Sequence, residues 1–145
     1  MSEKRNAKNP SSEETKRENQ ISYGIIGAAI EVHKVLGGPG LLESVYEEAL
    51  TYELGQHGFF VERQKLVPII YKHMPLATPL RLDENCVIIE CKAVSVYNPI
   101  FEAQTLTYLR LLNKWLGLVI NFGEMVVKNG IHRVVNPNYS DSSSL

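Results

Sequence analysis

Glu90 and Lys92 are the residues of this chain best suited to chemistry, because they end an apolar run. The run reads Val87-Ile88-Ile89 and leads directly into Glu90-Cys91-Lys92. Residues two apart on a strand point to the same face, so we expect the carboxylate and the ammonium to lie side by side. A carboxylate can hold a divalent cation and a lysine can orient the attacking water, which suits magnesium-assisted hydrolysis. Glu-x-Lys alone is a weak signal, and a solvated pair at a strand end is the alternative.

The elements that must position this pair are predicted from hydrophobic periodicity and turn residues. Helices are predicted over 21–36, 42–54 and 99–113, and Asn98 is expected to cap the last of them. Strands are predicted over 59–64, 66–71, 80–83, 86–92, 115–121, 125–128 and 131–135. Tight hairpins are expected around Glu84-Asn85 and Asn129-Gly130. This order predicts an α+β fold around a central sheet.

Length and composition predict one folded domain with polar ends. Of the 145 residues, 1–19 are expected to be a disordered tail, 20–136 the domain and 137–145 a flexible tail. The net charge is -1, so a nucleic-acid partner would need a local basic patch. No apolar run approaches the length of a membrane span and no signal peptide is visible, so a cytoplasmic location without a membrane is expected.

Several motifs recur in an order that resembles a known family. They are Gly40-Leu-Leu-Glu43-Ser-Val-Tyr46, Tyr71-Lys72, Arg81-Leu82-Asp83, Glu90-Cys91-Lys92, Gln104-x-x-x-Tyr108 and Gly117-Leu-Val-Ile-Asn-Phe-Gly123. Together they closely resemble the GxxExxY protein family, which is grouped with the PD-(D/E)XK nuclease superfamily. The resemblance implies a restriction-endonuclease-like αβββαβ core, here with an extra N-terminal helix and a C-terminal β-hairpin.

The resemblance also implies metal-dependent phosphodiester hydrolysis with Mg²⁺ or Mn²⁺. Asp83 and Glu90 would be the metal carboxylates, and Lys92 would position the water and steady developing charge. Glu43 would be an auxiliary acidic group. The implied partner is a nucleic acid, either DNA or RNA.

The segment between Asp83 and Glu90 departs from this pattern, because it is about three residues shorter than the family usually has. If Glu84-Asn85 is a two-residue turn, Asp83 pairs with Cys86 and Glu90 lies opposite Pro79. Asp83 is then roughly 13 Å from Glu90 along the hairpin. Two direct ligands of one magnesium ion must lie much closer together. We therefore expect a weakened or abolished metal site.

Structural roles compete with functional ones at several positions. Glu43 is also a favourable acid in the first turn of a helix, and Tyr46 favours packing with a satisfied hydroxyl. Gln104 is expected to support the site, because its helix reads as largely buried and a buried amide needs partners. Tyr108 is balanced between packing and site support. Surface or helix-end roles are expected for the histidines at 33, 57, 73 and 132.

Three hypotheses follow for the function. The first is a divalent-metal nuclease with impaired activity. The second is a non-catalytic module that binds nucleic acid or another protein on the same scaffold. The third, compatible with either, is a homodimer formed by pairing of hairpin edges within 125–135.

Overall fold

The computed structural model of the chain describes residues 12–63, 66–72, 74–77, 80–82 and 87–140. Its elements are α2 (Ser12–Val35), α3 (Glu43–Gln56), β1 (Val61–Glu62), β2 (Leu66–Tyr71), β3 (Met74–Ala77), β4 (Leu80–Leu82), β5 (Val87–Lys92), α4 (Ile100–Leu112), β6 (Leu116–Asn121), the 3-10 helix η1 (Val127–Gly130) and β7 (Ile131–Val135).

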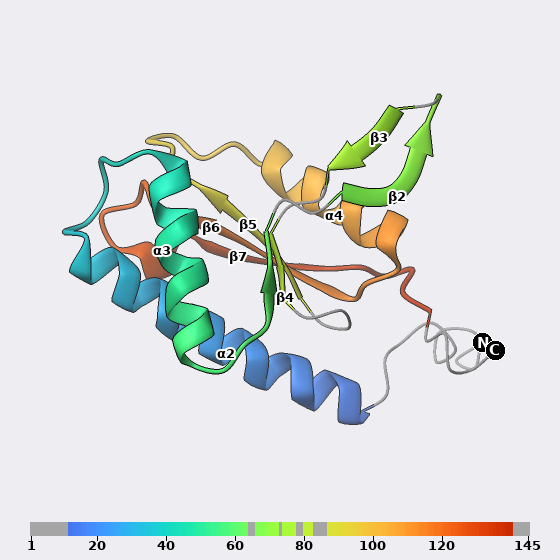
Figure 1. Cartoon of the computed structure of the whole chain (residues 1–145), viewed down its shortest axis with the longest axis horizontal. Helices are drawn as coiled ribbons and strands as arrows, with labels where there is room; N and C mark the ends of the chain where they lie inside the picture. The colour runs from blue at the N-terminus through green and yellow to red at the C-terminus, as the bar shows by residue number, and fades with distance from the viewer. Residues whose placement is uncertain (1–11, 64–65, 73, 78–79, 83–86, 141–145) are drawn as a thin grey trace.

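The central sheet has five strands in the order β1-β4-β5-β6-β7. Strands β5 and β6 are parallel and are connected through α4, whereas the remaining neighbours are antiparallel. Strands β2 and β3 form a separate two-stranded sheet that projects beyond α4 (Figure 1). The succession α3, β1, β4, β5, α4, β6 is the predicted αβββαβ core, so the predicted fold class is confirmed.

Helices cover both faces of the sheet. Ile25 of α2 and Leu50 of α3 belong to the same buried cluster as Ile89, whereas Ile88 packs with Leu109 of α4. Every residue of β6 is buried, which explains its continuous apolar sequence: a parallel strand inside a two-sided core has no polar face. No helix in the described part of the chain is long and apolar enough to cross a membrane.

The connection from α2 to α3 is fixed by backbone hydrogen bonds and by one tyrosine. Gly37 and Gly38 both have positive φ, and the N–H of Gly38 donates to the carbonyl of His33 at 2.8 Å, which closes the helix. The hydroxyl of Tyr46 donates to the carbonyl of Gly38 at 2.7 Å and accepts from the N–H of Leu41 at 3.1 Å. Tyr46 is fully buried, so the predicted packing role with a satisfied hydroxyl is confirmed.

Both predicted domain boundaries differ from the structure. Helix α2 begins at Ser12, so residues 12–19 are helical where the sequence predicted a disordered tail. The cause is that these residues are polar yet include good helix formers such as glutamate, lysine and arginine. At the other end, Tyr139 is buried and Ser140 exchanges two hydrogen bonds with the side chain of Asn113. Residues 137–140 are therefore part of the folded body, while 1–11 and 141–145 lie outside the described residues.

The predicted hairpin around Asn129-Gly130 is wrong, because β7 does not pair with a strand at 125–128. Residues Val127–Gly130 form the 3-10 helix η1, and β7 pairs antiparallel with β6. Burial explains the difference, because an apolar edge beside β6 offered β7 a longer ladder than a strand at 125–128. Two further details differ: β1 is shorter than the predicted strand at 59–64, and β3 was not predicted.

Candidate functional site

Glu90 and Lys92 lie side by side, as predicted from their spacing. The Nζ of Lys92 is 3.1 Å from Oε2 of Glu90, and both side chains are less than one fifth exposed. Lys92 also lies over the ring of Phe101 of α4, 4.7 Å from the ring centre. This contact places the pair on the face of β5 that α4 covers, at the carboxyl end of the strand. The ammonium is therefore held by one carboxylate and one aromatic face.

Glu43 belongs to a different element, α3, and interacts electrostatically with Glu90 and Lys92. It is the first residue of α3, and its pKa is raised, first because it is partly desolvated and then because Glu90 and Glu47 are negative; Lys92 opposes the shift. The structure therefore brings Glu43, Glu90 and Lys92 within electrostatic range of one another. The pKa of Glu43 is raised mainly by burial, and the neighbouring carboxylates add to that shift.

Glu47 is a buried carboxylate that the sequence interpretation missed. It lies one turn after Glu43 on α3, is 8% exposed, and its Oε2 is 3.5 Å from the Nε of Arg63. Burial raises the pKa of Cys91, and the carboxylates of Glu47, Glu90 and Glu43 raise it further. The spacing of four between Glu43 and Glu47 was the available signal, because it puts both acids on one helix face.

A groove of about 490 Å³ opens at the carboxyl ends of β5 and β6. It is lined by Pro39, Gly40, Leu41, Ala93, Val94, Ser95 and Gly123. The groove begins at the residue after Lys92 and reaches to within two residues of Glu43 along the chain. The crevice beyond the carboxyl ends of parallel strands is the usual ligand site in open sheets of this kind.

The fully buried side chain of Asn121 holds two walls of this groove together. Its Oδ1 accepts from the N–H groups of Val94 and Gly123, each at 3.0 Å. Its Nδ2 donates to the carbonyl of Val94 at 3.1 Å. All of its polar atoms are thus used to fix the loop that follows Lys92. Its position at the end of an apolar strand was the sequence signal for this role.

A second polar cluster lies on the α4 face and was also missed. The ring of His132 stacks on that of Tyr97 at 4.0 Å, and its Nδ1 lies 3.5 Å from Oε2 of Glu102. The Tyr97 hydroxyl donates to the same oxygen at 3.1 Å. Burial and this hydrogen bond raise the pKa of Tyr97. A surface or helix-end role was expected for His132 because the four histidines show no metal-ligand spacing, and the pairing of β7 with β6 brings it to this cluster instead.

The expectation of a buried Gln104 is wrong. Helix α4 packs through one side only, with Thr105 and Leu109 buried, and Gln104 is exposed on another side. The neighbouring apolar residues that suggested burial do not surround it, since Ala103 is exposed as well. Tyr108 is half-buried and packs against the cluster of Ile88 and Leu109, which favours the packing role.

Asp83 lies outside the described residues, but the register beside it is visible. Leu80 pairs with Ile89 and Leu82 with Val87, which is the register predicted for a two-residue turn. Leu82, the neighbour of Asp83 in the chain, therefore pairs three residues from Glu90, or about 10 Å along β5. This register supports the geometric objection to Asp83 as a direct partner of Glu90.

The described residues fit a divalent cation only in part. Carboxylate oxygens are the ligands that Mg²⁺ prefers, and Mg²⁺ is often held by one or two carboxylates with water and substrate phosphates. Glu43 and Glu90 supply two such groups. Within the described ranges, however, no three side chains of His, Cys, Asp or Glu gather closely enough to hold a metal ion. A cation here would need water or substrate to complete its shell.

The sequence pattern of the PD-(D/E)XK nuclease superfamily matches residues 19–134. Neither a curated protein nor a solved structure shows significant similarity to the chain. The matched segment contains α3, the whole central sheet apart from the last residue of β7, and the Glu90–Lys92 pair. From this match, the αβββαβ core and the Glu-x-Lys geometry, the chain belongs to the PD-(D/E)XK nuclease superfamily.

Proposed function

We propose that this protein is a nuclease of the GxxExxY type that hydrolyses phosphodiester bonds with a divalent metal, at a low rate. The observation that carries the proposal is the electrostatic proximity of Glu43, Glu90 and Lys92, which come from two elements and lie within three residues of groove-lining residues in the chain. Two carboxylates and one ammonium give these groups a net charge of -1, which a bound cation would offset.

The roles of the residues follow from their chemistry. Glu90 and Glu43 would hold Mg²⁺ or Mn²⁺, and when bound the ion would neutralise charge on the scissile phosphate. Lys92 would give up its contact with Glu90 in part and orient the attacking water or the phosphate oxygen. The groove between Leu41 and Ser95 would receive the sugar-phosphate chain, and Asn121 keeps its walls in place.

The low rate is proposed from the β4–β5 register. Leu82 lies opposite Val87, three residues before Glu90, so Asp83 would be a poor second ligand for a metal at Glu90 and the metal would be weakly held. Insertion of Leu-Leu-Val after Asp83 restores the missing residues. We expect the insertion to increase Mn²⁺ affinity, measured by calorimetric titration, whereas the same insertion with Asp83→Asn should not.

The test of activity is metal-dependent cleavage of end-labelled single- and double-stranded DNA and RNA. We expect slow cleavage in Mn²⁺ that is lost in EDTA and falls at least about 100-fold in Lys92→Met and Glu90→Gln. Gln56→Ala is the matched control, because Gln56 is exposed at the last position of α3 and its loss should leave cleavage unchanged. Cleavage that survives in both site variants would contradict the proposal.

A second candidate function is binding of nucleic acid without cleavage. Two observations favour the lack of cleavage in this candidate: Glu90 already holds Lys92 at 3.1 Å, and no three-ligand cluster is found among the described residues. This candidate predicts salt-sensitive binding that EDTA does not affect. A homodimer through β7, an edge strand of the sheet, also stays a proposal, and sedimentation velocity would test it.

A further inference from the structure

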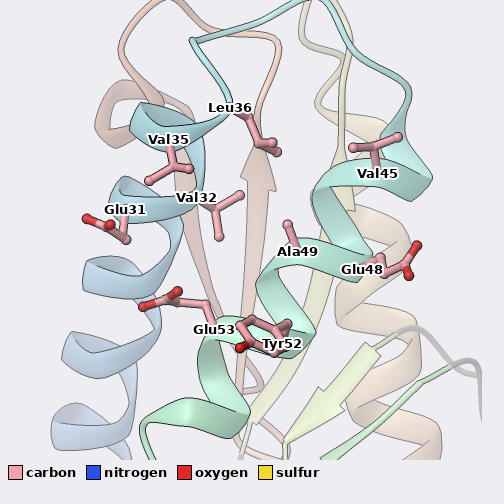
Figure 2. Close-up of a pocket in the computed structure, with 9 residues that line it drawn as sticks. All are labelled: Glu31, Val32, Val35, Leu36, Val45, Glu48, Ala49, Tyr52 and Glu53. Atoms are coloured by element: carbon pink, nitrogen blue, oxygen red, sulfur yellow. The ribbon is translucent and has the colours of Figure 1, made fainter.

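An apolar groove of about 500 Å³ runs between α2 and α3, between Val32 and Leu36 on one side and Ala49 and Tyr52 on the other (Figure 2). We call it the α2–α3 groove. Val32 is 5% exposed and belongs to the core, so the base of the groove is continuous with the packed interior. The groove is thus a depression over the core.

The walls of the α2–α3 groove are apolar side chains that the described fold leaves uncovered. Val35 at the end of α2 is 70% exposed and Tyr52 of α3 is 68% exposed, and both line the groove. Val45 lines it further along α3 (Figure 2). Exposed apolar side chains that share one concave surface are typical of a docking site, whereas scattered ones carry no such meaning.

The rim of the groove is acidic. Glu31, Glu48 and Glu53 line it, and the lining includes no lysine, arginine or histidine. Glu53 is paired with His57 at 2.9 Å outside the groove, whereas Glu31 and Glu48 have no ion-pair or hydrogen-bond partner among the described residues. An occupant that matches both the apolar floor and these two carboxylates would be apolar on one side and positively charged at its edges.

We infer that the α2–α3 groove binds a short basic amphipathic helix of a partner protein. The lining from Val45 to Tyr52 extends about 10 Å along α3, which matches two turns of a helix. A helix of this kind would place apolar side chains at positions i, i+3 and i+7 against the floor and lysines or arginines beside the glutamates. The inference concerns a surface that takes no part in the proposed hydrolysis.

Other occupants fit the charge less well. Nucleic acid and anionic membrane surfaces would be repelled by the rim. A second copy docked groove to groove would place Glu31 and Glu48 against their own equivalents, and like charges across an interface oppose association. The acidic rim therefore selects a cationic protein segment.

The experiment uses the whole chain and a labelled peptide of about fourteen residues, made of leucine and lysine with the leucines on one helix face. We expect saturable binding by fluorescence anisotropy, with NMR shifts confined to the groove. A peptide of the same composition with dispersed leucines is the probe control. Equal binding of the two peptides, or shifts centred elsewhere, would overturn the inference.

Protein variants make the test specific to the rim and the floor. Glu31→Lys and Glu48→Lys should each weaken binding about fivefold or more at low salt, and Ala49→Trp should weaken it by filling the floor. Glu13→Lys carries the same charge change at an exposed position near the start of α2 and should leave binding unchanged. An equal effect of Glu13→Lys would show general attraction only. Self-association that Glu48→Lys abolishes would identify a second copy as the occupant and overturn the inference.

Discussion

Glu90 and His132 lie in one row across the sheet, because both are register partners of Val119. They are two strands apart, which corresponds to about 10 Å, and Val119 between them packs on the α4 side. Val119 is fully buried beneath α4, so the cluster of His132 and Tyr97 is linked to Glu90 through packed side chains and not across an open surface. Strand β7 thus contributes to the packing beside the site, although it lies outside the αβββαβ core.

Lys92→Met should lower the free energy of unfolding by about 1–2 kcal/mol. Methionine keeps the stem of the side chain over Phe101 but leaves Glu90, less than one fifth exposed, without its partner. The double variant with Glu90→Gln should recover most of the loss, because the carboxylate charge is then absent. Urea denaturation measures both. A Lys92→Met protein as stable as the parent would indicate a solvated pair with no net attraction.

Asn121→Ala should lower the free energy of unfolding by about 2–4 kcal/mol. The change leaves two N–H groups and the carbonyl of Val94 without their side-chain partner in a buried place. Hydrogen exchange should show the largest loss of protection at Val94 and Gly123. Asn113→Ala, which removes the two hydrogen bonds to Ser140 at an exposed site, should cost less. Equal losses in the two variants would contradict the proposed role of Asn121 in the groove.

Gly123→Ala should destabilise the fold by about 2–4 kcal/mol, because an added Cβ would lie 2.1 Å from the carbonyl oxygen of Val94. The backbone at Val94 must then move, and the groove with it. Gly27→Ala is the opposite case: its Cβ would meet nothing within 4 Å. Since Gly27 is an exposed position inside α2, alanine there should stabilise by about 1 kcal/mol. Thermal unfolding distinguishes the two, and a neutral Gly123→Ala would show that the loop adapts freely.

The free energy of unfolding should fall as the pH rises from the unfolded-state pKa of Glu43 through its raised folded-state pKa. Partial burial and the carboxylates of Glu90 and Glu47 raise this pKa above 4.5, so the folded state binds the proton more tightly than the unfolded state. The stabilisation that protonated Glu43 contributes is complete below its pKa in the unfolded state and is lost above its pKa in the folded state. Glu43→Gln should therefore be more stable than the parent at pH 7, with the gain reduced at pH 4. Denaturation at both pH values in EDTA tests this sign, and a less stable Glu43→Gln at pH 7 would contradict it.

The sequence predicted what depends on local pattern. The two-residue spacing of Glu90 and Lys92 predicted their contact, and the turn residues after Leu82 predicted the β4–β5 register. Asn98 was expected to cap α4, and its Oδ1 accepts the N–H of Ile100 at 2.9 Å. Each of these relationships is decided by residues that are close together in the chain.

The sequence did not predict the features for which tertiary contacts outweigh local preferences. Asn129-Gly130 is a strong hairpin signal, yet pairing with β6 outweighs it and draws His132 into the sheet. The exposure of Gln104 depends on which side of α4 meets the sheet, and the apolar neighbours of Gln104 do not reveal that side. Glu47 and Arg63 are sixteen residues apart, and only the packing of α3 near β1 brings them together.

Strands β1 and β4 pair as neighbours in the central sheet, although β2 and β3 lie between them in the sequence. Val61 pairs with Leu82 and Glu62 with Arg81, and β2 and β3, which lie between β1 and β4 in the sequence, form a sheet of their own outside the central one (Figure 1). The described residues between β1 and β4 form no ladder pairs with the central sheet, so the length of this segment can change while the strands of the core keep their register. A change in the length of this segment therefore need not alter the residues around Glu90.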